Sequence, residues 1–241
     1  MAAGLIPDER TRRALARLEA APLNFDPGEL AAGTDAWSYD ERVQPLPAEP
    51  PGPRQPGGAW ELARRLMRGY EFADPSLVRA YHDPATPLEG RTLLLEVRWW
   101  GLRFRVGCRV ADVYERVEPV GDRDALVSGW SYRTLAGHFE QGEMHWQVAK
   151  WPETGEVAFR LYSWSRWARD VHPLVRAGIA LFGRRAQLRF YDRTCARMLR
   201  LTEAALAGTE PGAAVRTASE RHTTSRRDDA VHDELARNVE R

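Results

Sequence analysis

Apolar side chains recur at every second position in a series of short runs between residues 93 and 165. The first two runs flank Gly101, and their alternate positions include four arginines: Arg98, Arg103, Arg105 and Arg109. A period of two is that of a strand with one buried face, so these runs predict a β-hairpin. Further runs at roughly 125–134, 143–151 and 156–165 predict three more strands. Because every connection is of hairpin length, the sheet is expected to be antiparallel.

Two other segments have helical spacing. Residues 59–70 place three large apolar side chains on one face, which predicts a helix. A longer pattern over 173–206 starts with Pro173, which suits a first helical turn, and predicts a long C-terminal helix. A further helical turn is expected after Asp74-Pro75, since Asp caps helices and Pro tolerates the first helical position.

The first 58 residues differ in character from the rest. Residues 8–21 predict a short helix capped by Asp8, and residues 37–43 predict one edge strand. Residues 45–58 hold six prolines and three glycines, a composition that excludes helix and ladder strand and predicts an extended surface strap or a linker. We therefore expect an N-terminal extension (1–58), a domain (59–207) and a polar, disordered tail (208–241).

Residues 129–145 carry the densest set of polar groups and read Gly-Trp-Ser-Tyr-Arg-Thr-Leu-Ala-Gly-His-Phe-Glu-Gln-Gly-Glu-Met-His. This segment resembles the Tyr-Gly-Thr-Leu…Gly-His…Glu-x-Gly-Glu string of uncharacterised protein family 0548. The matching positions are Tyr132, Thr134, Leu135, Gly137, His138, Glu140, Gly142 and Glu143, and Ser165-Arg166 and Gln187 resemble later elements of the family. The chain departs from the family pattern at three positions: Arg133 replaces the glycine of Tyr-Gly-Thr-Leu, Met144 replaces a second glutamate, and Trp167 replaces the proline after Ser-Arg. The resemblance extends over roughly residues 59–206.

The order of elements indicates an α+β fold of the helix-grip type, in which a curved antiparallel sheet wraps around the long C-terminal helix. This is the plan of the START and plant-pollen-allergen superfamily, and the resemblance to family 0548 implies the same START-like fold. Such a fold leaves a cavity between sheet and helix. The alternative is a plain α+β sandwich with a filled core.

Composition narrows the classes of partner. The formal net charge is +1, so no global field attracts nucleic acid or an anionic membrane. The basic positions of the hairpin (Arg98, Arg103, Arg105 and Arg109) have acidic neighbours in the sequence, which favours a salt-bridged surface over a nucleic-acid site. No run approaches ~18 apolar residues and no signal peptide is evident, so a cytoplasmic protein without a membrane span is expected. Cys108 and Cys195 lack metal-ligand spacing and are expected to be small buried hydrophobic residues.

His138, Glu140, Glu143 and His145 have side chains of the types that bind zinc or iron. With a period of two, however, Glu143 and His145 point away from the apolar face of their strand, unless a bulge near Gly142 reverses the phase. We therefore expect no metal and no cofactor. The competing interpretation is that His138 and Glu143 hydrogen-bond the backbone across a tight turn.

Three functional classes stay open. The first is binding of a small hydrophobic molecule in the cavity, with the candidate ligand contacts Tyr132, Thr134, His138, Trp146, Phe159 and Ser163. The second is an enzyme of the cyclase or dehydratase type, in which His138, Glu143 and Tyr132 transfer protons. The third is an interaction module that uses the proline-rich strap or the charged tail. Tryptophans crowded in the predicted sheet either line the cavity or fill the core.

Overall fold

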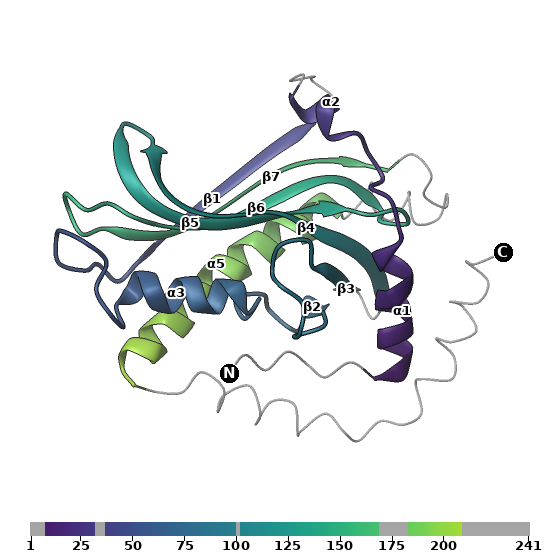
Figure 1. Cartoon of the computed structure of the whole chain (residues 1–241), viewed down its shortest axis with the longest axis horizontal. Helices are drawn as coiled ribbons and strands as arrows, with labels where there is room; N and C mark the ends of the chain where they lie inside the picture. Colours follow the sequence, from purple (N-terminus) through teal and green to yellow (C-terminus); the bar gives the residue numbers. More distant parts are fainter. Residues whose placement is uncertain (1–7, 32–36, 100–101, 169–182, 209–241) are drawn as a thin grey trace.

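The computed structural model describes residues 8–31, 37–99, 102–168 and 183–208. Its centre is a seven-stranded sheet in the order β1-β7-β6-β5-β4-β3-β2, with every neighbouring pair antiparallel (Figure 1). The strands are β1 (Ser38–Leu46), β2 (Val78–Tyr81), β3 (Thr92–Trp99), β4 (Leu102–Val120), β5 (Arg123–Thr134), β6 (Glu140–Lys150) and β7 (Val157–Trp167). The predicted antiparallel sheet is confirmed.

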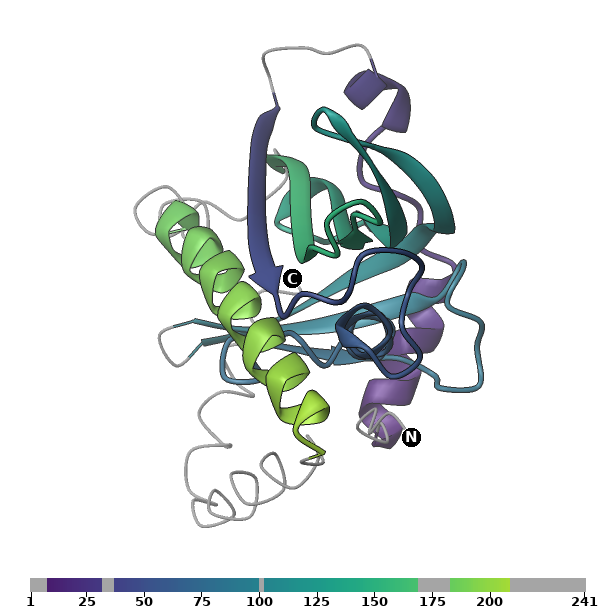
Figure 2. The same ribbon diagram turned by 90° about the vertical axis from the view of Figure 1, so that its left-hand side faces the viewer.

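The helices are α1 (Glu9–Glu19), α2 (Pro27–Ala31), α3 (Ala59–Arg68) and α5 (Arg184–Leu206). Helices α3 and α5 cross the same face of the sheet, which we call the inner face (Figures 1 and 2). A curved antiparallel sheet closed by the C-terminal helix is the helix-grip arrangement, so the predicted fold class is confirmed. Of the long helix expected over 173–206, residues 173–182 lie outside the described residues, as does the tail from residue 209 onward.

Helix α1 covers the other, outer face of the sheet at β3 and β4. The side chain of Asp8 accepts a hydrogen bond from Thr11 N at 2.7 Å, so the predicted N-cap is confirmed. At the other end of the helix, Arg109 donates to the carbonyl oxygens of Leu18, Glu19 and Ala21. Carbonyl oxygens at the end of a helix lack the usual intrahelical donors, and one guanidinium here contacts three of them at once.

The basic face of the β3–β4 hairpin is an ion-paired surface. The carboxylate of Glu96 is buried and bonds Arg98 at 2.8 Å, with Arg105 at 3.7 Å. With Arg109 bound to α1, three of the four predicted arginines are engaged within the protein. Two of these arginines share the buried carboxylate of Glu96, so this part of the surface is salt-bridged, as the acidic neighbours in the sequence indicated.

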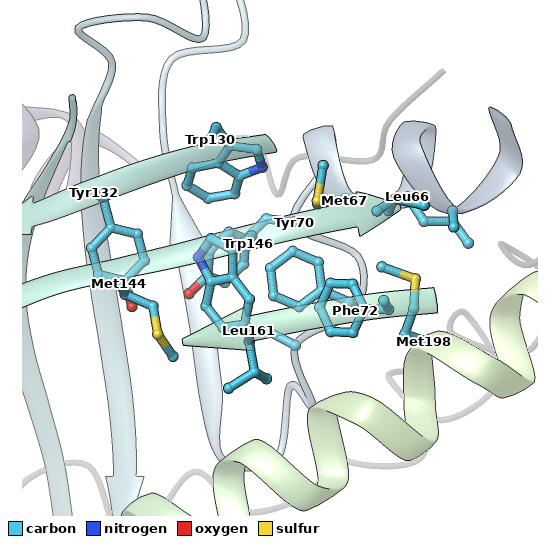
Figure 3. Close-up of a cluster of buried hydrophobic side chains, with 14 of the residues drawn as sticks. Leu66, Met67, Tyr70, Phe72, Trp130, Tyr132, Met144, Trp146, Leu161 and Met198 are labelled. Atoms are coloured by element: carbon cyan, nitrogen blue, oxygen red, sulfur yellow. The ribbon is translucent and has the colours of Figure 1, made fainter. Parts of the chain in front are cut away.

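Large aromatic rings fill the inner face beneath α3 and the second half of α5. Figure 3 shows this cluster, with Trp146 between Tyr132 on one side and Phe72 on the other. The ring of Trp146 lies 4.5 Å from that of Phe72 and 6.2 Å from that of Phe159, centroid to centroid. Cys108 and Cys195 are both buried free thiols, as expected. This end of the space between sheet and helices is a packed core.

The proline-rich segment 47–58 is a strap held against the turn between β6 and β7. Glu49 N donates to Gly155 O at 2.8 Å and Gly52 N donates to Pro152 O at 2.7 Å. Gly155 has φ +78°, and a Cβ atom there would lie 1.9 Å from Glu49 O, so this close approach requires glycine. The strap follows β1, which pairs with β7 along its whole length. Residues before 59 therefore contribute a full strand to the sheet.

Strand β2 was not expected, because four residues are too few to show a period. The turn expected after Asp74-Pro75 forms as a single turn and does not continue as a helix. Asp74 O accepts from Leu77 N and Val78 N, both at 2.9 Å, and the chain then enters β2.

Candidate functional site

A cavity of about 620 Å³ lies between the inner face of the sheet and the first half of α5. Its apolar lining comes from β3, β4, β6 and α5 and includes Leu95, Val97, Phe104, Met144 and Phe190. Polar side chains from β5, β6, β7 and α5 border its other side. The volume falls within the range of about 300–1,000 Å³ that is usual for small-molecule pockets.

Four of the six predicted ligand contacts line this cavity: Tyr132, Thr134, His138 and Ser163. The other two, Trp146 and Phe159, do not. Both are fully buried in the aromatic cluster against Phe72 (Figure 3). They face the inner side of the sheet as the alternation predicted, but they lie farther along it, under α3, where the protein fills the space itself.

The hydroxyl of Thr134 is committed to the architecture. It donates to Asn24 Oδ1 at 2.6 Å and accepts from Gly142 N at 3.0 Å. Asn24 also donates to the carbonyl oxygens of His138 and Glu140. The N-terminal segment thus fixes the β5–β6 connection, and Thr134 shapes the cavity wall through this network.

His138 is a neutral structural residue at the turn between β5 and β6. Its Nδ1 accepts the backbone N–H of Glu140 at 2.9 Å. Burial lowers the pKa of His138 to about 3, so the imidazole carries no charge at neutral pH. The interpretation of a hydrogen bond to the backbone across a tight turn is confirmed for His138. It is wrong for Glu143, whose carboxylate is bound by the side chains of Ser131, Arg133 and His145.

Glu143 borders the cavity, but its carboxylate lies on the outer face of the sheet. It accepts from Ser131 Oγ at 2.9 Å and Arg133 Nε at 2.8 Å, and His145 Nε2 lies at 3.1 Å. Burial opposes ionisation, yet hydrogen bonds from His145 and Arg133 outweigh it and lower the pKa of Glu143 to about 2. A proton-transferring pair of His138 and Glu143 does not fit this placement, because the two side chains have different partners on different faces.

Gly142 does not interrupt the alternation of inward and outward side chains along β6. It has φ +156°, and a Cβ atom there would lie 2.1 Å from Trp164 O. The register between β6 and β7 nevertheless runs without a break from Glu140 to Lys150. The bulge that would have turned Glu143 inward is absent from β6, and the glycine serves a close approach of two strands.

The polar side of the cavity centres on Glu140. Gln187 Nε2 donates to Glu140 Oε1 and to Ser165 Oγ, both at 3.2 Å. Burial, reinforced by Asp40 and opposed by Arg184, raises the pKa of Glu140 to about 7. Near neutral pH this carboxyl therefore exists in both protonation states.

Ser163 and Tyr191 form a second polar pair, with their oxygens 3.0 Å apart. Burial raises the pKa values of Tyr132 and Tyr191, so both phenols stay protonated at neutral pH. The ligand contacts predicted from the sequence did not include Tyr191, Gln187 or Glu140. Gln187 and Tyr191 are four residues apart, so a polar stripe on the predicted terminal helix was the available signal.

Tyr70 reaches the cavity from a strained position at the end of α3. It has φ +57°, the only non-glycine residue in the described ranges with a positive φ. Tyr70 N bonds Met67 O and Glu71 N bonds Leu66 O, the pattern of a helix end at which glycine is usual. The tyrosine ring instead packs 4.8 Å from Phe72 and 5.9 Å from Trp130. Aromatic packing therefore offsets the backbone strain and directs Tyr70 inward.

Residues 28–197 match the family described as "Domain of unknown function (DUF1990)". The chain belongs to this family. The match confirms that the protein is a member of a family without an assigned function, as the resemblance predicted. No curated protein matches the sequence. Within the parts of this DUF1990 protein that the structure describes, no three His, Cys, Asp or Glu side chains are grouped as a metal site. No helix in those parts is both long and apolar enough to cross a membrane.

Solved structures resemble the DUF1990 protein at low identity. The hypothetical protein jhp0584 from Helicobacter pylori is 14% identical, with 74% of this chain and 95% of that chain covered and a TM-score of 0.44. Ara h 8.0201 is 7% identical, with coverages of 68% and 99% and a TM-score of 0.38. The di-domain ARO/CYC BexL from the BE-7585A biosynthetic pathway is 13% identical, with coverages of 69% and 46% and a TM-score of 0.40. At these identities and TM-scores, the similarities say nothing about function.

The raised pKa of Glu140 gives a measurable pH dependence of stability. Between about pH 4.5 and 7 the folded protein retains a proton that the unfolded chain has released. The free energy of unfolding therefore falls as pH rises through this window, by up to about 3 kcal/mol. Glu140→Gln has no proton to lose and removes this fall. Urea unfolding of both proteins at pH 5, 6, 7 and 8 measures the difference, and parallel pH profiles would contradict it.

Proposed function

We propose that this protein binds a small hydrophobic molecule in the cavity between the sheet and α5. The observation that carries the proposal is the cavity of about 620 Å³ with apolar walls and a few converging polar groups. The walls supply the favourable burial of apolar ligand surface. The Glu140–Gln187 and Ser163–Tyr191 pairs at the polar side supply hydrogen-bonding partners for an oxygen or nitrogen atom of the ligand.

The polar groups also narrow the kind of ligand. A protonated Glu140 donates one hydrogen bond and accepts others, and Tyr191 and Ser163 can do both. Arginine side chains also line the cavity: Arg98, which pairs with Glu96, Arg193, which pairs with Asp74, and Arg185 and Arg189. A largely apolar compound with one or two hydroxyl or carbonyl groups fits the apolar wall and the two polar pairs.

Native mass spectrometry of the purified full-length chain tests the proposal directly, because a bound compound appears as a mass difference that organic extraction removes. The uncharged dye Nile red is a second probe, since its fluorescence rises in an apolar cavity. Saturable binding of Nile red at a stoichiometry near one is expected. The proposal fails if the native mass equals that of the bare chain and Nile red does not bind.

A cavity-blocking variant locates the binding site. Ala186 lies on α5 and lines the cavity, so Ala186→Trp places an indole within it. We expect Nile red affinity to fall at least about tenfold. Ala196→Trp makes the same substitution on an exposed position of the same helix and should leave affinity unchanged. Equal affinity for wild type and Ala186→Trp, with unchanged circular dichroism, would place the dye elsewhere.

The enzyme of the cyclase or dehydratase type remains as a second candidate, and Glu140 is the observation that favours it. A carboxyl with a pKa of about 7 beside an apolar cavity is suited to give and take a proton at neutral pH. His138 and Glu143 are not suited, because their pKa values are about 3 and about 2. The test is to incubate the protein with the compound that co-purifies with it and to follow conversion of that compound into a product. Conversion that Glu140→Gln abolishes while binding persists supports catalysis.

A further inference from the structure

A second cavity, of about 520 Å³, lies between α3 and the segment that joins β2 to β3. Figure 1 shows these elements as neighbours below the sheet. Its lining is rich in arginine. Arg64, Arg65 and Arg68 lie on α3, and Arg91 directly precedes β3. His82, directly after β2, forms part of the same wall. This cavity is separate from the proposed hydrophobic site, because the other side of α3 packs into the aromatic core.

The positive charge of this cavity is only partly balanced. Arg64 pairs with Glu115 at 3.0 Å, and Glu61 accepts from the backbone N–H of Gly57. Arg68 and Arg91, by contrast, form no ion pair with any residue in the described parts of the chain. Arg91 bonds the carbonyl oxygens of Thr86 and Pro87, which fixes its guanidinium in place.

The charges of Arg68 and Arg91, which line the same cavity, also repel one another. Burial, together with the charge of Arg68, lowers the pKa of Arg91, while Asp83 partly offsets both effects. Two like charges held together on separate elements are unfavourable. An anion between them would remove that repulsion, and guanidinium groups match the oxygens of a phosphate in a bidentate manner.

His82 provides an independent sign of the same environment. It is 7% exposed, and its Nδ1 has no hydrogen-bond partner in the described protein. Burial and the neighbouring Arg91 lower the pKa of His82, so the ring is neutral. A buried imidazole without a partner is uncommon, since buried polar groups are normally satisfied. A bound anion would favour its protonated, hydrogen-bonding form.

We propose that this cavity binds a phosphate-bearing anion, held by the guanidinium groups of Arg68 and Arg91 with His82 at its wall. The group of arginines favours a multiply charged anion over a single carboxylate, because one carboxylate would leave most of the charge unmatched. The phosphate belongs either to a small free molecule or to a lipid headgroup, and the two sources are separated by experiment.

Isothermal titration calorimetry of the full-length chain with pyrophosphate tests the free source. Flotation with vesicles that contain phosphatidic acid, a phosphomonoester, against phosphatidylcholine vesicles tests the lipid source. In whichever assay shows binding, Arg68→Gln should weaken it at least about tenfold. Arg68 is an exposed helix residue, so its replacement leaves folding intact. Arg200→Gln removes the same charge from an exposed site on α5 that does not line the cavity, and should leave binding unchanged.

Nuclear magnetic resonance of the His82 ring adds a readout that reports on the cavity itself. Pyrophosphate should raise the pH at which the His82 resonances titrate, because the anion stabilises the imidazolium. Absence of binding in both assays overturns the proposal. So does an equal loss of binding in Arg68→Gln and Arg200→Gln, since that result means a general response to net charge.

Discussion

Replacing Lys150 by methionine is expected to lower the free energy of unfolding by about 3–5 kcal/mol. The ammonium group of Lys150 is fully buried. It lies 2.6 Å from Glu49 Oε2 and 3.1 Å from Pro50 O. Methionine fills the same space but leaves the Glu49 carboxylate buried without its countercharge. Breaking a buried pair from one side is costly because the remaining charge loses its compensation.

Glu49 does more than pair with lysine. It also accepts the backbone N–H groups of Trp60 at 2.8 Å and Gln55 at 3.1 Å, and so joins the strap to the first turn of α3. Burial alone would raise the pKa of Glu49, but these hydrogen bonds and Lys150 outweigh it and hold the pKa below its usual value. The stability from this group is therefore present above about pH 4.5 and is lost as pH falls through the lower folded value.

Urea unfolding of wild type, Lys150→Met, Glu49→Gln and the double variant forms a cycle that isolates the coupling of the pair. Arg123→Met is the matched control. It removes an exposed partner of Glu156 at 2.6 Å and should cost less than about 1 kcal/mol. A Lys150→Met protein as stable as Arg123→Met would show that the buried pair does not hold the strap.

Replacing Trp146 by alanine is expected to cost about 3–5 kcal/mol of unfolding free energy, because a fully buried indole leaves a cavity among packed rings. Trp146→Phe keeps an aromatic ring in contact with Phe72 and should cost less than about 1.5 kcal/mol. Among the described residues the indole Nε1 has no hydrogen-bond partner, so phenylalanine gives up no hydrogen bond there.

The same pair of variants separates packing from ligand contact. Since Trp146 lies outside the lining of the larger cavity, Trp146→Phe should bind Nile red with the affinity of wild type. A Trp146→Phe protein of near-wild-type stability but clearly weaker dye binding would show that Trp146 contacts the ligand, as the sequence pattern predicted.

The sheet was predictable because its signal is local. A period of two over eight or more residues predicts a strand and its buried face without any knowledge of its partners, and only the four-residue β2 was too short to show one. Glu143 is an example: alternation alone predicted that its side chain lies on the opposite face of the sheet from Met144. The same rule put Tyr132, Ser163, Trp146 and Phe159 on one face, but it cannot say which part of that face is covered by α3 and which by the cavity.

The polar site depended on contacts that no short window contains. Glu140 and Gln187 are 47 residues apart, and Glu49 and Lys150 are 101 apart. Whether Glu140 has an ordinary pKa or one near 7 depends on burial and on Asp40, which only the folded chain brings close. Likewise, Asn24 reaches Thr134 across 110 residues, so segments outside the expected domain proved to support its turn.

The amino-acid order by itself determined the strand pattern, the inward faces, the α1 cap and the family, since each rests on neighbouring residues. Tertiary structure alone decided that aromatic rings fill one end of the space while the other stays open, and that three arginines of α3 meet Arg91 and His82. Packing volume and electrostatic environment are set by side chains from distant segments. They exist only once the chain has closed on itself.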